Sequence, residues 1–145
     1  MAILDGRDLS TCRRFAGYLA DRSICTSLVE LDEAHRRLWI RLASVTRFSV
    51  ALDGAATTTL IDALASTTAC AVPCEHAKGD HVLRAGPVTE PVVVPHTERR
   101  DGRPVRLTLH LGEADVDRIE VVLPRRATDA LVAHLRTCRA SMPSR

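Results

Sequence analysis

Apolar and polar residues alternate with a period of two in four segments of the chain. These segments are residues 37–42, 47–52, 106–111 and 118–123. Such a period is typical of strands that bury one face. We therefore expect the four segments to be strands of one mostly antiparallel sheet, with an apolar face and a polar face.

The period changes after the second and the fourth of these segments. Leu60 and Leu64 are four residues apart, as are Leu131 and Leu135, which is the spacing of one helical face. Each pair therefore predicts an amphipathic helix that follows a strand. We expect both helices to cover the apolar face of the sheet.

The two halves of the chain resemble each other. Residues 47–64 and 118–135 align at a constant offset of 71 with seven identical residues, and 37–42 aligns with 106–111. Two matched blocks in the same order are the sequence signature of an internal repeat. We infer that one structural unit occurs twice.

The predicted fold class is therefore α+β, with internally duplicated βββα units in a single domain. The first unit spans residues 26–67 and the second spans 91–139, and short opening strands are expected at 28–31 and 91–95. In this arrangement the strands form a mostly antiparallel sheet, and the helices lie on one of its faces.

Three further segments complete the expected organisation of residues 1–145. An apolar stripe that includes Phe15 and Ala16 predicts an N-terminal helix at residues 8–22. Residues 68–90 are rich in proline and glycine and are expected to form an irregular connector. Residues 140–145 are expected to be a C-terminal tail.

Composition limits the class of protein. Of the 145 residues, 46% are hydrophobic but only 3% are aromatic, so the core must be aliphatic. The net charge of +2 argues against a protein that wraps nucleic acid by charge alone. The N-terminal residues lack the apolar region of a signal peptide, and no apolar run reaches the ~20 residues of a membrane helix. We expect no membrane association and a cytoplasmic protein whose five cysteines are reduced thiols.

Arginine placement is the most informative chemical feature. Coding bias explains the ratio of 19 Arg to one Lys, but five Arg and the only Trp fall on polar positions of the expected strands. Guanidinium groups pair with carboxylates and phosphates, and an indole stacks on apolar groups or bases. The predicted partner-binding residues are Arg37, Trp39, Arg41, Arg47, Arg106, His110 and Arg118.

This Arg/Trp face is open to several interpretations. We expect a non-catalytic interaction or regulatory module that docks an acidic protein partner, as a homodimer or within a larger complex. Nucleic-acid binding through the same face is the alternative, although sheets that bind single-stranded RNA usually carry two or three aromatic residues. A solvated face without a partner is the third interpretation.

A cluster of soft metal ligands lies in the expected connector. Cys70, Cys74, His76 and His81 fall within twelve residues, and zinc binds thiolate and imidazole. The spacing departs from common zinc patterns, since one residue separates Cys74 from His76. A small zinc protein or enzyme that uses this segment is therefore an alternative to a protein without a cofactor.

No sequence motif supports catalysis. The chain lacks the P-loop, the dinucleotide-binding glycine motif, the H-E-x-x-H zinc motif and the G-x-S-x-G nucleophile motif. We therefore assign no catalytic residue and favour binding over an enzymatic function.

Overall fold

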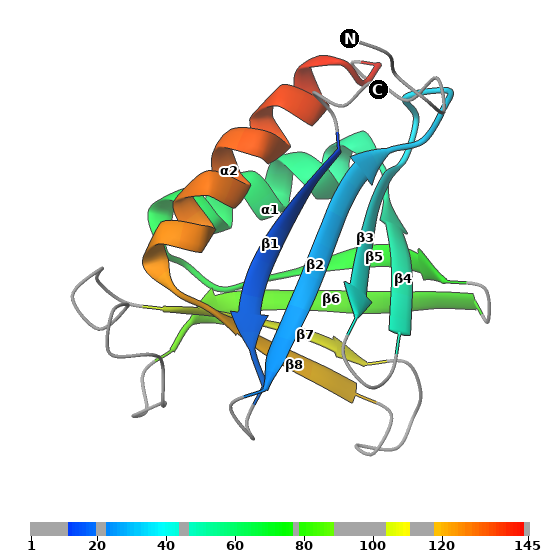
Figure 1. The fold of residues 1–145 in the computed structure, drawn as a ribbon. Coiled ribbons are helices and arrows are strands. Elements are labelled where there is room, and N and C mark those ends of the chain that lie inside the picture. Colours follow the sequence, from blue (N-terminus) through cyan, green and yellow to red (C-terminus); the bar gives the residue numbers. More distant parts are fainter. Residues whose placement is uncertain are drawn as a thin grey trace, which may run out of the picture.

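In the part of the chain that the structure describes, eight antiparallel strands follow one another around a closed barrel in their order along the chain (Figure 1). The described residues of this computed structural model are 12–19, 23–43, 47–76, 79–88, 104–110 and 118–143. One helix follows the fourth strand and another follows the eighth. The elements are β1 (Cys12–Tyr18), β2 (Ile24–Leu31), β3 (Leu38–Ala43), β4 (Arg47–Leu52), α1 (Gly54–Ser66), β5 (Cys70–His76), β6 (Gly79–Pro87), β7 (Val105–His110), β8 (Arg118–Leu123) and α2 (Arg125–Ala140).

The predicted sheet with helices on one face is wrong. The strands close into a barrel, and each helix follows four strands rather than three, so the order is ββββα twice instead of βββα twice. Alternation along a strand defines its two faces, whereas closure depends on how neighbouring strands tilt and stagger. The sequence pattern therefore fits an open sheet and a barrel equally well.

The predicted N-terminal helix at residues 8–22 is also wrong. The described part of this segment contains β1, which pairs along its whole length with β2. Phe15 is buried and Ala16 is exposed, so these two residues of the expected helical stripe point to opposite sides of a strand. Residues 8–11 and 20–22 lie outside the described residues.

The expected irregular connector, residues 68–90, contains the hairpin of β5 and β6. Seven residue pairs join these two strands. Pro73 lies within β5. Among the described residues, β5 pairs with β4 only at Glu75, so most of the edge of β5 that faces β4 has no neighbouring strand. Such an edge-like position tolerates proline. The expected strand at 91–95 lies outside the described residues.

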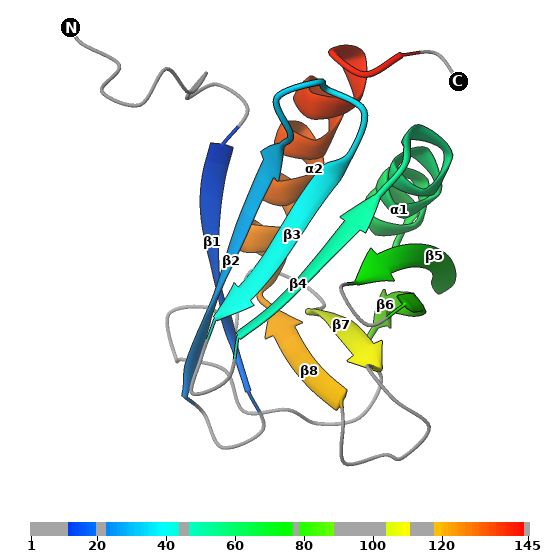
Figure 2. The same cartoon turned by 90° about the vertical axis from the view of Figure 1, so that its right-hand side faces the viewer.

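The barrel consists of two four-stranded sheets that meet at two narrow seams. Continuous ladders join β1 through β4 in one sheet and β5 through β8 in the other. Among the described residues, the pair Tyr18–Val122 joins β1 to β8, and the pair Ala51–Glu75 joins β4 to β5. Figure 2 shows the strands of one sheet running across those of the other. The sheets therefore splay apart beyond each seam.

The two seams occupy equivalent places in the two halves of the chain. β4 and β8 are separated by the 71-residue offset of the sequence repeat, which relates the seam residues Ala51 and Val122. The strand registers make Leu38 of β3 the structural equivalent of Val105 of β7. The sequence alignment instead matches Leu38 with the residue two positions after Val105. A shift of two residues keeps each side chain on the same face of the strand.

The helices close the splayed barrel. They lie side by side (Figure 1), with α1 packed on α2, β5 and β6, and α2 packed on α1, β1 and β8. The predicted helix-face residues Leu60, Leu64, Leu131 and Leu135 are each at most 2% exposed. They share one core, mostly aliphatic, with the inward-facing side chains of both sheets.

Two arginines of α2 hold opposite ends of α1. Arg125 donates hydrogen bonds to the Leu64 carbonyl at 3.3 Å and to Thr67 Oγ1 at 3.1 Å, where α1 ends. Arg139 donates a 2.8 Å hydrogen bond to Thr58 Oγ1 in the first turns of α1. The charge of Arg125 also lies favourably at the negative end of the α1 dipole. The helix pair is thereby fixed at both ends.

The seam between β1 and β8 requires a glycine. A Cβ atom on Gly17 would overlap Val121 Cγ1 and would lie 2.9 Å from Leu123 Cδ2 and 3.0 Å from the Val122 carbonyl oxygen. These neighbours belong to β8 and to the barrel interior, so they have little room to move. Gly17 therefore allows the close approach that joins the two sheets.

A buried histidine links α2 to the first sheet. His134 is 2% exposed, and its Nε2 donates a 2.9 Å hydrogen bond to the Val29 carbonyl of β2. Its ring centroid lies 5.7 Å from that of Phe15, and Cys138 Sγ is 3.5 Å from Nε2. Burial lowers the pKa of His134 below its usual value, and the nearby Arg13 adds to this effect. The hydrogen bond to Val29 opposes this shift in part, and on balance folding favours the neutral imidazole.

The substitution Gly17→Ala should lower the free energy of unfolding by about 1–3 kcal/mol, the usual cost of overfilling a packed site. Urea unfolding measures this change. The matched control is Gly86→Ala, because a Cβ there lies 3.3 Å from the Cβ of exposed Ala69 and can be accommodated by a small shift. Equal stability of the Gly17 variant and the wild type would contradict the proposed role of Gly17.

Stability should fall as the pH drops below the ordinary histidine pKa of 6.5, because the unfolded chain then binds a proton that folded His134 resists. The stabilisation that comes from keeping His134 neutral is fully present above pH 6.5. It is lost as the pH falls toward the lowered pKa of His134 in the folded protein. The His134→Gln variant keeps an amide donor for the Val29 carbonyl but does not titrate. Urea unfolding between pH 7 and 5 should show a flatter pH dependence for this variant, and identical slopes would refute the assignment.

Candidate functional site

The only Trp of the chain lies on the outward face of the first sheet. Leu38 and Ile40 of β3 point into the core, so Trp39 points outward. The Arg41 guanidinium lies over the Trp39 ring at 4.9 Å from the centroid, and Arg41 Nη1 donates a 2.8 Å hydrogen bond to Glu30 Oε1 on β2. The Trp39 and Arg41 side chains of β3 are thus held in a defined arrangement by Glu30 of the adjacent strand β2.

A row of paired residues extends this site across β1, β2 and β3. Arg14 pairs in register with Leu28, and Leu28 pairs with Arg41. Directly paired residues of antiparallel strands lie on the same face of the sheet. We call the outward-facing group of Arg14, Leu28, Glu30, Trp39 and Arg41 the Trp39 face.

Sequence reasoning missed Arg14 as a member of this site. The residue falls in the segment that we expected to be a helix, although its exposed position next to buried Phe15 follows strand alternation. Only Phe15 and Gly17 mark the buried side of β1, and glycine contributes nothing to a hydrophobic pattern. The signal existed but was too short to distinguish a strand from a helix.

Closure of the barrel separates the predicted partner-binding residues into two groups. Trp39 and Arg41 lie on β3, whereas Arg106 and His110 lie on β7 and Arg118 lies on β8. Three strands separate β3 from β7 in either direction around the barrel. Outward-facing side chains of these two strands therefore point away from each other. The single Arg/Trp face expected from the sequence does not exist as one surface.

The two remaining residues of the predicted face lie at the ends of strands of the first sheet. Arg37 precedes β3, and its Nε donates a 3.2 Å hydrogen bond to Glu75 Oε2 across the seam between β4 and β5. This pair is exposed to solvent, with 40% and 57% of the side-chain surfaces accessible, so it contributes little to stability. Arg47 begins β4, and its side chain lies outside the described residues, as do those of His110 and Arg118.

The register of β5 and β6 does not assemble the expected zinc ligands. Cys70 and Cys74 lie on the same strand four residues apart, about 13 Å along an extended chain. Two sulfurs that share one zinc ion lie only about 4 Å apart. Cys74 is paired with His81 on β6, and the side chain of His76 lies outside the described residues. No group of three or more metal-binding side chains occurs in the described part of the chain.

Three of the five cysteines, Cys25, Cys70 and Cys138, are poorly suited to act as nucleophiles. All five are free thiols, and Cys25, Cys74 and Cys138 are buried. Burial raises the pKa values of Cys25 and Cys70, and it raises that of Cys138 to about 11. Since a thiolate is the reactive form, these three residues are poor nucleophiles at neutral pH.

Comparisons with known proteins add no assignment to this geometry. The chain matches no family model, no curated protein and no solved structure. Neither helix in the described residues is long and apolar enough to cross a membrane.

The substitution Arg41→Ala should shift the fluorescence emission of Trp39 to longer wavelength, because loss of the guanidinium exposes the indole to water. The free energy of unfolding should change by about 1 kcal/mol or less, as expected for a half-exposed ion pair and cation–π contact. Since Trp39 is the only Trp, the emission reports this site alone. The control Arg84→Ala, at an exposed position of β6, should leave the spectrum unchanged. An unchanged spectrum for the Arg41 variant would argue against the stacked arrangement.

Proposed function

We propose that the protein is a non-catalytic interaction module that binds a protein partner through the Trp39 face. The observation that most supports this proposal is the stack of Arg41 on Trp39, fixed by the ion pair to Glu30. Trp and Arg are the residues that most often dominate protein interfaces. Side chains already held in place lose little conformational freedom on binding, which favours affinity.

The charges of the Trp39 face favour an acidic partner. Arg14 and Arg41 flank Leu28 in one cross-strand row. The side chain of Arg41 remains 39% exposed, whereas that of Glu30 is only 12% exposed. The ion pair uses one of the five N–H donors of the guanidinium, so others remain available for a carboxylate. A partner with an apolar centre and an acidic rim would complement this surface.

Affinity enrichment from extracts of the source cell tests this proposal. Wild-type protein, Trp39→Ala, Arg41→Ala and the matched control Arg84→Ala are immobilised, and captured proteins are identified and quantified by mass spectrometry. We expect an acidic partner whose capture falls by about tenfold or more with either face variant, the loss typical of an interface hot spot. The Arg84 control should retain that partner.

Three outcomes would contradict the proposal. One is equal capture of the same proteins by Trp39→Ala and the wild type. Another is loss of capture after nuclease treatment together with a steep decrease of affinity with salt, which would indicate nucleic-acid binding instead. The third is capture of further copies of this chain and of no other protein, which would indicate that the face joins two copies.

A further inference from the structure

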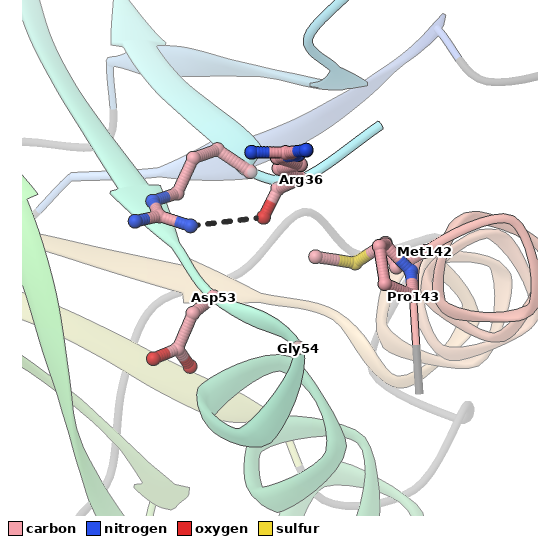
Figure 3. Close-up of a pocket in the computed structure, with 6 residues that line it drawn as sticks. Arg36, Asp53, Gly54, Met142 and Pro143 are labelled. Carbon is pink, nitrogen blue, oxygen red and sulfur yellow. Dashed lines mark hydrogen bonds between the residues drawn. The ribbon is translucent and has the colours of Figure 1, made fainter. Parts of the chain in front are cut away.

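A small cavity lies where three distant segments of the chain meet (Figure 3). Its volume is about 280 Å³, close to the lower limit for pockets that hold small ligands. The turn before β3, the start of α1 and the segment after α2 each contribute two lining residues. They are Arg36, Arg37, Asp53, Gly54, Met142 and Pro143.

Two arginines at this cavity, Arg36 and Arg139, have no carboxylate partner among the described residues, whereas the lining residue Arg37 pairs with Glu75. Among the described residues, the hydrogen bonds of Arg36 involve its backbone alone: its N–H donates to Asp32 Oδ1, and its carbonyl accepts from Arg37 Nη1. No described hydrogen-bond or ion-pair partner faces its guanidinium. Just outside the lining, Arg139 lies so close to Gly54 that a Cβ on Gly54 would be 3.2 Å from Arg139 Cζ. The described hydrogen bonds of Arg139 go to neutral oxygens, Thr58 Oγ1 and the Pro143 carbonyl.

The carboxylates of Asp53 and Asp32 accept hydrogen bonds from backbone groups rather than from Arg36 or Arg139 side chains. Asp53 is the N-cap of α1, and its Oδ1 accepts a 2.8 Å hydrogen bond from the Ala56 N–H. Figure 3 shows the Asp53 carboxylate turned away from Arg36. Asp32 Oδ1 accepts from the backbone N–H groups of Arg36 and Arg37. The guanidinium donors of Arg36 thus remain available to an anion from solution.

The opposite wall of the cavity is apolar. Met142 is 6% exposed, and its side chain points from the end of α2 into the space that faces Arg36 and Asp53 (Figure 3). Pro143 continues this wall. A ligand with a compact negative charge toward Arg36 and an apolar group toward Met142 and Pro143 would complement both walls.

We propose that this cavity binds a small organic anion, with a phosphate-monoester or carboxylate group toward Arg36 and an apolar group against Met142 and Pro143. Arg36 supplies a planar pair of donors that matches either anion. The apolar group adds buried area that inorganic phosphate lacks. The proposal does not rest on the proposed protein-binding function.

Isothermal titration calorimetry at constant ionic strength tests the site, with phenyl phosphate, benzoate and inorganic phosphate as probes. At least one aromatic anion should bind saturably and more tightly than inorganic phosphate, and the aromatic anion that binds identifies the preferred charged group. Arg36→Gln should weaken this binding by about tenfold or more, the loss expected for a charge-assisted hydrogen bond. Arg84→Gln on β6 is the matched control and should bind as the wild type does.

The proposal is overturned if neither aromatic anion binds saturably, or if Arg36→Gln and the wild type bind with equal affinity. Arg36 is exposed and has no described side-chain partner, so its substitution should not disturb the fold. The thermal unfolding curve of the unliganded variant checks this point. If Arg36→Gln unfolds, the milder variant Arg36→Lys keeps the charge, removes the planar donor pair and should still bind more weakly.

Discussion

At each seam of the barrel, one described pair of residues joins the two sheets, so strand pairing there supplies few of the contacts that hold the barrel closed. The helix pair supplies much of the remainder, because α1 packs on the second sheet and α2 packs on β1 and β8. Arg125 and Arg139 fix α1 to α2 at both ends, and Gly17 permits the tight approach of β1 to β8. The closed barrel thus depends on side-chain packing and on the absence of a side chain at Gly17.

Closure also decides which residues can act together. On an open sheet, Arg41 of β3 and Arg106 of β7 would share a face, whereas in the barrel their strands lie on opposite sides. The candidate site is therefore smaller than the sequence suggested, but it gains Arg14 from β1 and a defining contact with Glu30 from β2. The Trp39 face is thus one compact basic and aromatic surface rather than a long arginine-rich one.

The sequence predicted the segments whose alternation was long and uninterrupted, namely β3, β4, β7 and β8, and the helix after each hairpin. It did not predict β1, whose buried side is marked only by Phe15 and a glycine, or β5 and β6, where proline and glycine conceal the alternation. The Arg41–Trp39 contact was accessible because residues two apart on a strand share a face. The ion pair of Arg41 with Glu30 could not be predicted from the sequence, because it depends on the register between β2 and β3.

The central claim is that the two sheets join into one barrel, which places β3 and β7 on opposite sides. Backbone nuclear Overhauser effects in solution test it most directly. The closed barrel predicts cross-strand effects between Tyr18 and Val122 and between Ala51 and Glu75, together with the ladder of β1 and β2. Absence of both seam contacts, with the ladders inside each sheet intact, would show an open arrangement and would contradict the account.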